Sequence, residues 1–128
     1  METLSEKVLR CAVKVHSALG CGFLEKIYEN ALVHELRKEG LQVEQQKPIV
    51  IRYDGVVVGE YVADLVVEGK LLLELKAIAG FSAEHTAICL NYLRATKIPV
   101  CLLLNFGRTA LQIKRLVGDN YIDFPEKI

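Results

Sequence analysis

The sequence lacks most of the motifs that identify common classes of site. Its four cysteines are scattered, with no Cys-x-x-Cys pair and no paired Cys/His spacing, so neither a zinc site nor a redox motif is predicted. A glycine-rich phosphate loop is missing, as is any Ser/His/Asp or Cys/His nucleophile set. Charged side chains in unusual places are therefore the remaining candidates for chemistry.

Net charge and long apolar runs are lacking as well. Sixteen basic and sixteen acidic residues cancel, so no overall positive field attracts a polyanion, and tight non-specific binding of nucleic acid is not expected. No apolar run approaches the length of a membrane span, and the first six residues do not resemble a secretory leader. We therefore expect a protein of the reducing cytoplasm that does not enter a membrane.

The length and pattern of the chain predict one domain over residues 1–128 with a single active site. Helical spacing and capping residues predict three helices, at Ser5–Leu19, at Leu24–Glu39 and from the N-cap Ser82 to Thr96. Strands are predicted at Leu41–Tyr53 through Pro48, Val56–Val67, Lys70–Lys76, Val100–Leu104 and Leu111–Val117, and the tail from Gly118 is expected to be partly frayed.

The almost purely apolar run Val100–Leu104 is typical of a central strand that a helical crossover places parallel to the strand before it. The first three strands are joined by short turns at Asp54-Gly55 and Glu68-Gly69, which predicts that they are antiparallel. The fold class predicted is therefore α/β, with helices flanking a mixed sheet in the order ααβββαββ.

Three charged residues interrupt two of the most apolar stretches of the chain. Asp64 lies within Tyr61–Val67, and Glu74 and Lys76 lie within Leu71–Ala77. Residues two apart in a strand point the same way, so Glu74 and Lys76 share one face. Buried charges are costly unless they are paired or bind an ion, which predicts a cleft or ion site. Asp followed about ten residues later by Glu-x-Lys is an arrangement used by metal-dependent nucleases. A solvated surface pair is the alternative for Glu74 and Lys76.

The order of elements and these residues resemble the PD-(D/E)XK nuclease superfamily, whose fold is restriction-endonuclease-like. Within it, the run from His16 to Glu29 is similar to the signature of the GxxExxY protein family, with Gly22, Glu25 and Tyr28 at the named positions. Further matching segments are Ala31-Leu32, Glu35-Leu36, Gly40-Leu41, Ala63-Asp64, Glu74–Ala77, Asn91-Tyr92-Leu93 and Leu104–Gly107.

The resemblance implies specific roles. Asp64 and Glu74 would be the metal-binding carboxylates for Mg²⁺ or Mn²⁺, and Lys76 would lie beside the attacking water. Glu25 would be the acidic residue at the edge of the site. No organic cofactor is implied, and the expected partner is DNA or RNA.

One position departs from the family pattern, because Ile88 stands where the family has a glutamine four residues before Tyr92. Either the glutamine is dispensable or this chain has lost part of its site. Three further residues are accessory candidates. His85 shares a helix with Ile88, although a solvated histidine is the simpler interpretation; Tyr28 and Tyr92 would also serve as core residues with a polar tip.

Three functions remain open on the sequence alone. The first is a magnesium-dependent nuclease or related phosphodiesterase. The second is a catalytically impaired nuclease-like domain that binds nucleic acid or a protein. The third is a small structural homo-oligomer, for example a homodimer, in which a second copy covers apolar surface.

Overall fold

The computed structural model describes residues 1–118 and 128. Its elements are α1 (Leu4–Leu19), α2 (Glu25–Lys38), β1 (Val43–Tyr53), β2 (Val56–Val67), β3 (Leu71–Lys76), α3 (Ala83–Thr96), β4 (Val100–Asn105) and β5 (Gln112–Val117). This order confirms the predicted ααβββαββ arrangement. The predicted fraying of the tail falls on residues 119–127, which lie outside the described part of the chain.

The five strands form one mixed sheet in the order β1-β2-β3-β4-β5. β1, β2 and β3 are successive antiparallel neighbours, and β3 pairs in parallel with β4 in the register Leu71↔Val100 to Lys76↔Asn105. β5 returns antiparallel to β4. The crossover through α3 is therefore confirmed, and the most apolar strands are central, where both faces are covered.

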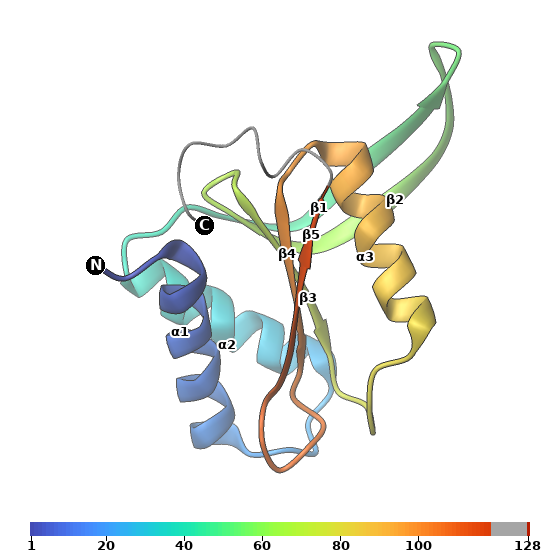
Figure 1. The fold of residues 1–128 in the computed structure, drawn as a ribbon. Helices are drawn as coiled ribbons and strands as arrows, with labels where there is room; N and C mark the ends of the chain where they lie inside the picture. The colour runs from blue at the N-terminus through green and yellow to red at the C-terminus, as the bar shows by residue number, and fades with distance from the viewer. Residues whose placement is uncertain (119–127) are drawn as a thin grey trace.

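Helices cover both faces of the sheet. α1 and α2 lie on one face and α3 lies on the other (Figure 1). Alternation along β3 matches these layers, because Leu71, Leu73 and Leu75 pack in the core beneath α1 and α2, whereas Leu72 packs beneath α3. Glu74 and Lys76 have the parity of Leu72, so their side chains start from the α3 face. No helix among the described residues combines the length and apolarity needed to cross a bilayer.

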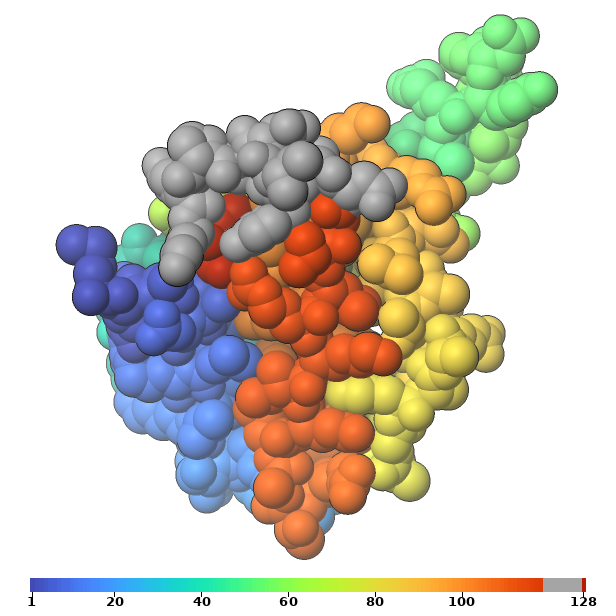
Figure 2. Space-filling view, in the orientation of Figure 1, coloured from blue at the N-terminus to red at the C-terminus, as the bar shows by residue number. Residues whose placement is uncertain are grey.

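The β1–β2 hairpin extends well past the rest of the sheet. β2 pairs with β3 only from Leu65↔Leu73 to Val67↔Leu71, whereas its pairing with β1 continues to the turn at Tyr53↔Val56. Residues 50–61, here called the hairpin arm, therefore stand out from the body of the molecule (Figure 2). Pro48 fits within β1 because this is an edge strand with a single neighbour.

Candidate active site

Asp64 and Glu74 meet where β2 and β3 separate. Beyond the last ladder pair, Leu65↔Leu73, each side chain bonds to the backbone of the other strand. The Leu75 N–H donates to Asp64 Oδ2 at 2.8 Å, and the Asp64 N–H donates to Glu74 Oε1 at 3.0 Å. The two carboxylates thus replace ladder hydrogen bonds and are fixed beside each other by rigid strands.

The environment of this pair opposes negative charge. Glu74 is only 6% exposed, and burial, together with the negative charge of Asp64, raises its pKa from the usual 4.5 to about 9. Burial also raises the pKa of Asp64, and the charge of Glu29 adds to that rise. In the metal-free protein Glu74 is therefore protonated at neutral pH, as expected for two carboxyl groups that share one site without a cation.

Glu29, on α2, supports Asp64 through Gln46 and was not among the site residues predicted from the sequence. It is 4% exposed, and its carboxylate accepts bonds from Gln45 Nε2 at 2.5 Å, Lys26 Nζ at 2.9 Å and Gln46 Nε2 at 2.9 Å. Gln46 Nε2 also lies 3.3 Å from Asp64 Oδ1. The Gln46 amide therefore links Glu29 to Asp64.

The backbone at Gln46 helps to place this amide. Gln46 has φ of 54°, in the left-handed region that non-glycine residues seldom occupy, and the β1–β2 register passes from Gln45↔Leu65 to Lys47↔Ala63. Such local strain is retained where the surrounding structure imposes it, often at functional sites. The signal for Glu29 was present in the sequence, because it lies on the same helical face as the buried Leu32, Val33 and Leu36.

Two residues of the Gly22, Glu25 and Tyr28 signature form no hydrogen bond or ion pair with the carboxylate pair within the described residues. Glu25 is exposed in the first turn of α2, and the described contacts join Glu29, one turn later, to Asp64. Tyr28 is fully buried, stacks on Phe106 with a centroid separation of 4.8 Å, and donates to the Gly20 carbonyl at 2.6 Å. Tyr28 therefore secures the α1–α2 loop, and a direct contact of Glu25 with substrate stays a prediction.

Lys76 and Glu74 line a small hollow beneath α3, together with His85, Ile88, Cys89, Tyr92 and Leu103. Lys76 is half-buried, and its Nζ forms no hydrogen bond or ion pair within the described residues. Its ammonium group is therefore available to a bound molecule. Ile88 contributes an apolar wall at the position where the family resemblance predicts an amide.

Tyr92 and His85 have structural partners as well as places in this hollow. The Tyr92 hydroxyl lies 3.4 Å from the Val62 carbonyl, and its ring packs edge-on against Tyr61 at 5.2 Å. Burial, and then the charges of Glu74 and Asp64, raise the pKa of Tyr92, so it remains a neutral phenol. His85 Nδ1 accepts the Ser82 N–H at 3.0 Å and so caps the start of α3.

A buried asparagine fixes the chain just after Lys76. Asn105 Oδ1 accepts the Ile78 N–H and its Nδ2 donates to the Ile78 carbonyl, both at 3.0 Å. At Gly107 an added Cβ would lie 2.4 Å from Ile78 N, so only glycine allows this approach. The ends of β3 and β4 are thus held together, which fixes the direction of β3 at Lys76.

The donor set suits a hard divalent cation. Mg²⁺ is commonly held by one or two carboxylates, with water and substrate phosphate completing its coordination. Asp64 and Glu74 supply two carboxylates, and Glu74 Oε2 accepts no hydrogen bond from a described residue. No group of three or more His, Cys, Asp or Glu residues able to hold a metal occurs in residues 1–118 and 128. These two residues therefore form the candidate ligand set.

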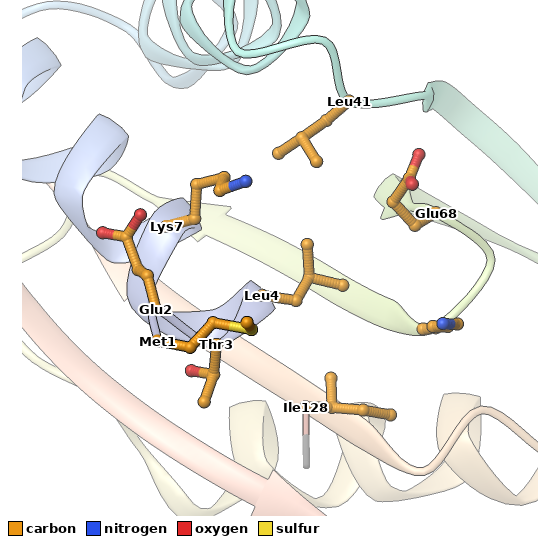
Figure 3. A pocket seen from close by; sticks show the side chains of 9 residues that line it. Met1, Glu2, Thr3, Leu4, Lys7, Leu41, Glu68 and Ile128 are labelled. Carbon is orange, nitrogen blue, oxygen red and sulfur yellow. The ribbon is translucent and has the colours of Figure 1, made fainter. Parts of the chain in front are cut away.

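A second hollow lies apart from this site. It is formed by the start of α1, Leu41, the β2–β3 turn and Ile128, and it presents Lys7 and Glu68 but neither Asp64 nor Glu74 (Figure 3). It therefore offers no equivalent of the paired strand carboxylates.

Comparison with known families agrees with the fold. Residues 2–116 match the model of a family described as the PD-(D/E)XK nuclease superfamily. Because the match covers most of the sequence, the chain belongs to this superfamily. Comparisons with curated proteins and with solved structures found no match. The finer resemblance to the GxxExxY family stays a prediction.

Proposed function

We propose that this protein is a metal-dependent nuclease that hydrolyses phosphodiester bonds of DNA or RNA. The observation that carries the proposal is the pair of the half-buried Asp64 and the buried Glu74, each held against the other's backbone, with Lys76 on the same face of β3 as Glu74. Membership of the superfamily supports hydrolysis of nucleic acid.

Each residue has a distinct task in this proposal. Asp64 and Glu74 would hold Mg²⁺ or Mn²⁺, and Glu74 would lose its proton when it does so. The ion would polarise the phosphate and stabilise the charge that develops on it. Lys76, whose ammonium has no partner among the described residues, would orient the attacking water by hydrogen bonding. Gln46 and Glu29 would keep Asp64 in position.

The test is cleavage of labelled single- and double-stranded DNA and RNA in Mg²⁺ or Mn²⁺. Lys76→Ala should lower turnover by about 10²–10⁴-fold while the Mg²⁺-induced rise in melting temperature persists. Asp64→Ala should abolish both turnover and the Mg²⁺-induced rise in melting temperature. Turnover in excess chelator, or undiminished turnover of Asp64→Ala, would rule out the mechanism.

Ile88 favours a second candidate function. It places an apolar sec-butyl side chain in the hollow that Glu74 and Lys76 line, at the position where the family resemblance predicts an amide. The second candidate is therefore a nuclease-like domain that binds nucleic acid without cutting it. Binding in Mg²⁺ with no cleavage of any of the four substrates would support this alternative.

A further inference from the structure

Another concave surface, distinct from the two hollows described above, lies between α3 and the hairpin arm. It is lined by Val50, Ile51, Arg52, Tyr61, Asn91, Arg94 and Ala95. We call this surface the arm groove. In Figure 1 the hairpin arm passes the end of α3 that leads to β4, and in Figure 2 it stands clear of the body of the molecule.

The polar residues of the arm groove are cationic or neutral. Arg52 and Arg94 are exposed, and neither forms an ion pair within the described residues. Asn91 adds an exposed amide, and the lining includes no carboxylate. Glu60 lies opposite Val50 in the arm but is not part of this lining. Although the whole chain has no net charge, this surface carries two uncompensated positive charges.

The arm groove adjoins the candidate active site. Ile88 lines the hollow at Lys76, and Asn91, Tyr92 and Ala95 follow it at spacings of three, four and seven residues, which is one face of a helix. Tyr92 lines the site, while its edge-on neighbour Tyr61 lines the arm groove. Seven residues of helix span about 10 Å, so both surfaces lie within reach of one short polymer.

We propose that the arm groove binds the sugar–phosphate backbone of the nucleic-acid strand whose scissile phosphate lies at Asp64, Glu74 and Lys76. Arg52 and Arg94 contact phosphates outside the scissile position, because guanidinium groups suit phosphate oxygens. Tyr61 presents an aromatic surface on which a base stacks. This inference rests on the proposed nuclease function, since it assigns the residues that hold the substrate of that site.

Binding is measured first, in chelator, so that no cleavage is required. Fluorescence anisotropy of labelled single-stranded DNA, and of RNA of the same sequence, about 20 nucleotides long, reports affinity as salt is varied. Arg52→Ala/Arg94→Ala should lower affinity about tenfold or more at low salt and reduce the slope of log affinity against log salt by about 1.4, since each phosphate contact contributes about 0.7. Tyr61→Ala should weaken binding with no change in that slope.

The matched control removes two exposed arginines from elsewhere. Arg37, on α2, donates to the Val43 carbonyl, and Arg108 follows β4 near His16 of α1. Arg37→Ala/Arg108→Ala has the same net charge as the test variant and should keep the affinity and salt slope of the original chain. Equal losses in the two double variants would overturn the proposal, as would competition by polyglutamate as strong as that by single-stranded DNA.

Cleavage kinetics separate the failure of this inference from the failure of the proposed function. The arginine variant should raise KM at least tenfold with kcat nearly unchanged, whereas Lys76→Ala should lower kcat. If the arginine variant cleaves as the original chain does, the proposed binding role of the arm groove is overturned, while the proposed nuclease function stands. Binding that depends on the two arginines but leads to no cleavage would overturn the proposed nuclease function and retain the arm groove as a binding surface. If neither the single-stranded DNA nor the RNA binds, the proposed binding role of the arm groove is overturned.

Discussion

The two faces of the sheet differ in the size of their apolar cores and in the charged residues that β3 presents. Beneath α1 and α2 the apolar core is the larger one, with Leu73 and Phe106 among its fully buried side chains. Beneath α3 the core is smaller and shares its face of β3 with Glu74 and Lys76. One face supplies most of the apolar burial, which allows the other to hold charged groups whose burial costs free energy.

The first way to test this comparison is to remove apolar volume from the face that α1 and α2 cover. Leu73→Ala deletes a fully buried side chain next to Glu74 in the sequence but on the opposite face. It should lower the free energy of unfolding by about 2–5 kcal/mol, measured by urea denaturation. Lys76→Ala, three residues along the same strand, should change it by less than about 1 kcal/mol. Comparable losses of unfolding free energy in the two variants would contradict the view that the face beneath α1 and α2 supplies most of the stability.

The second test uses the pH dependence of stability in chelator. Glu74 takes up a proton near pH 4.5 in the unfolded chain but near pH 9 in the native one. Between these values the native state holds a proton that the unfolded state lacks, so the stability that Glu74 contributes should be fully present below pH 4.5 and be lost as pH rises towards 9. The raised pKa of Asp64 acts in the same direction. The contribution of Glu74 alone to the slope should reach at most about 1.4 kcal/mol per pH unit.

Glu74→Gln is the control for this dependence. Its amide oxygen can still accept the Asp64 N–H, but it does not titrate. The variant should be more stable than the original chain at pH 8 and should lose most of the slope, whereas Mg²⁺ should stabilise the original chain more than the variant. Parallel stability curves for the two proteins would show that Glu74 titrates normally.

The third test compares two carboxylates one turn apart on α2. Glu29→Ala leaves the amides of Gln45 and Gln46 and the ammonium of Lys26 without this acceptor, and should cost about 1–3 kcal/mol. Because Glu29 raises the pKa of Asp64, the change should also lower that pKa. Glu25→Ala removes an exposed group and should cost at most about 0.5 kcal/mol. Thermal unfolding measures the stabilities, and carboxyl NMR titration measures the pKa.

Much of this architecture could be predicted from local patterns. Capping at Ser82, the turn at Asp54-Gly55 and the apolar run of β4 are short-range signals, and each predicted feature is present. The shared face of Glu74 and Lys76 followed from the two-residue period of a strand, whereas the structure was needed to show that this face, which is also that of Leu72, lies beneath α3.

The contacts around Asp64 could not be predicted in this way. They depend on where β2 leaves β3, on the left-handed backbone at Gln46, and on a helix that approaches from a distant part of the sequence. None of these has a local signature. A motif centred on Glu25 therefore pointed to the helix whose Glu29 is linked to Asp64 through Gln46, while the role of Glu25 itself stays a prediction.

The smallest expected effect tests whether the α3 face has lost part of its chemistry. Ile88 lines the hollow at Lys76 and is half-buried, so Ile88→Gln would place an amide, both donor and acceptor, beside the reacting groups. We expect kcat to rise by about tenfold or less, measured by cleavage at saturating substrate in Mg²⁺, because groups that brace a metal site are worth about 10–100-fold when removed. Ile88→Met, which keeps the wall apolar at similar volume, is the control and should leave kcat unchanged. Equal rates for the two variants would mean that polarity at this position is irrelevant and that the glutamine of the family pattern is dispensable here. A rise in Ile88→Gln alone would show that the hollow lacks one polar contact while its carboxylates remain competent.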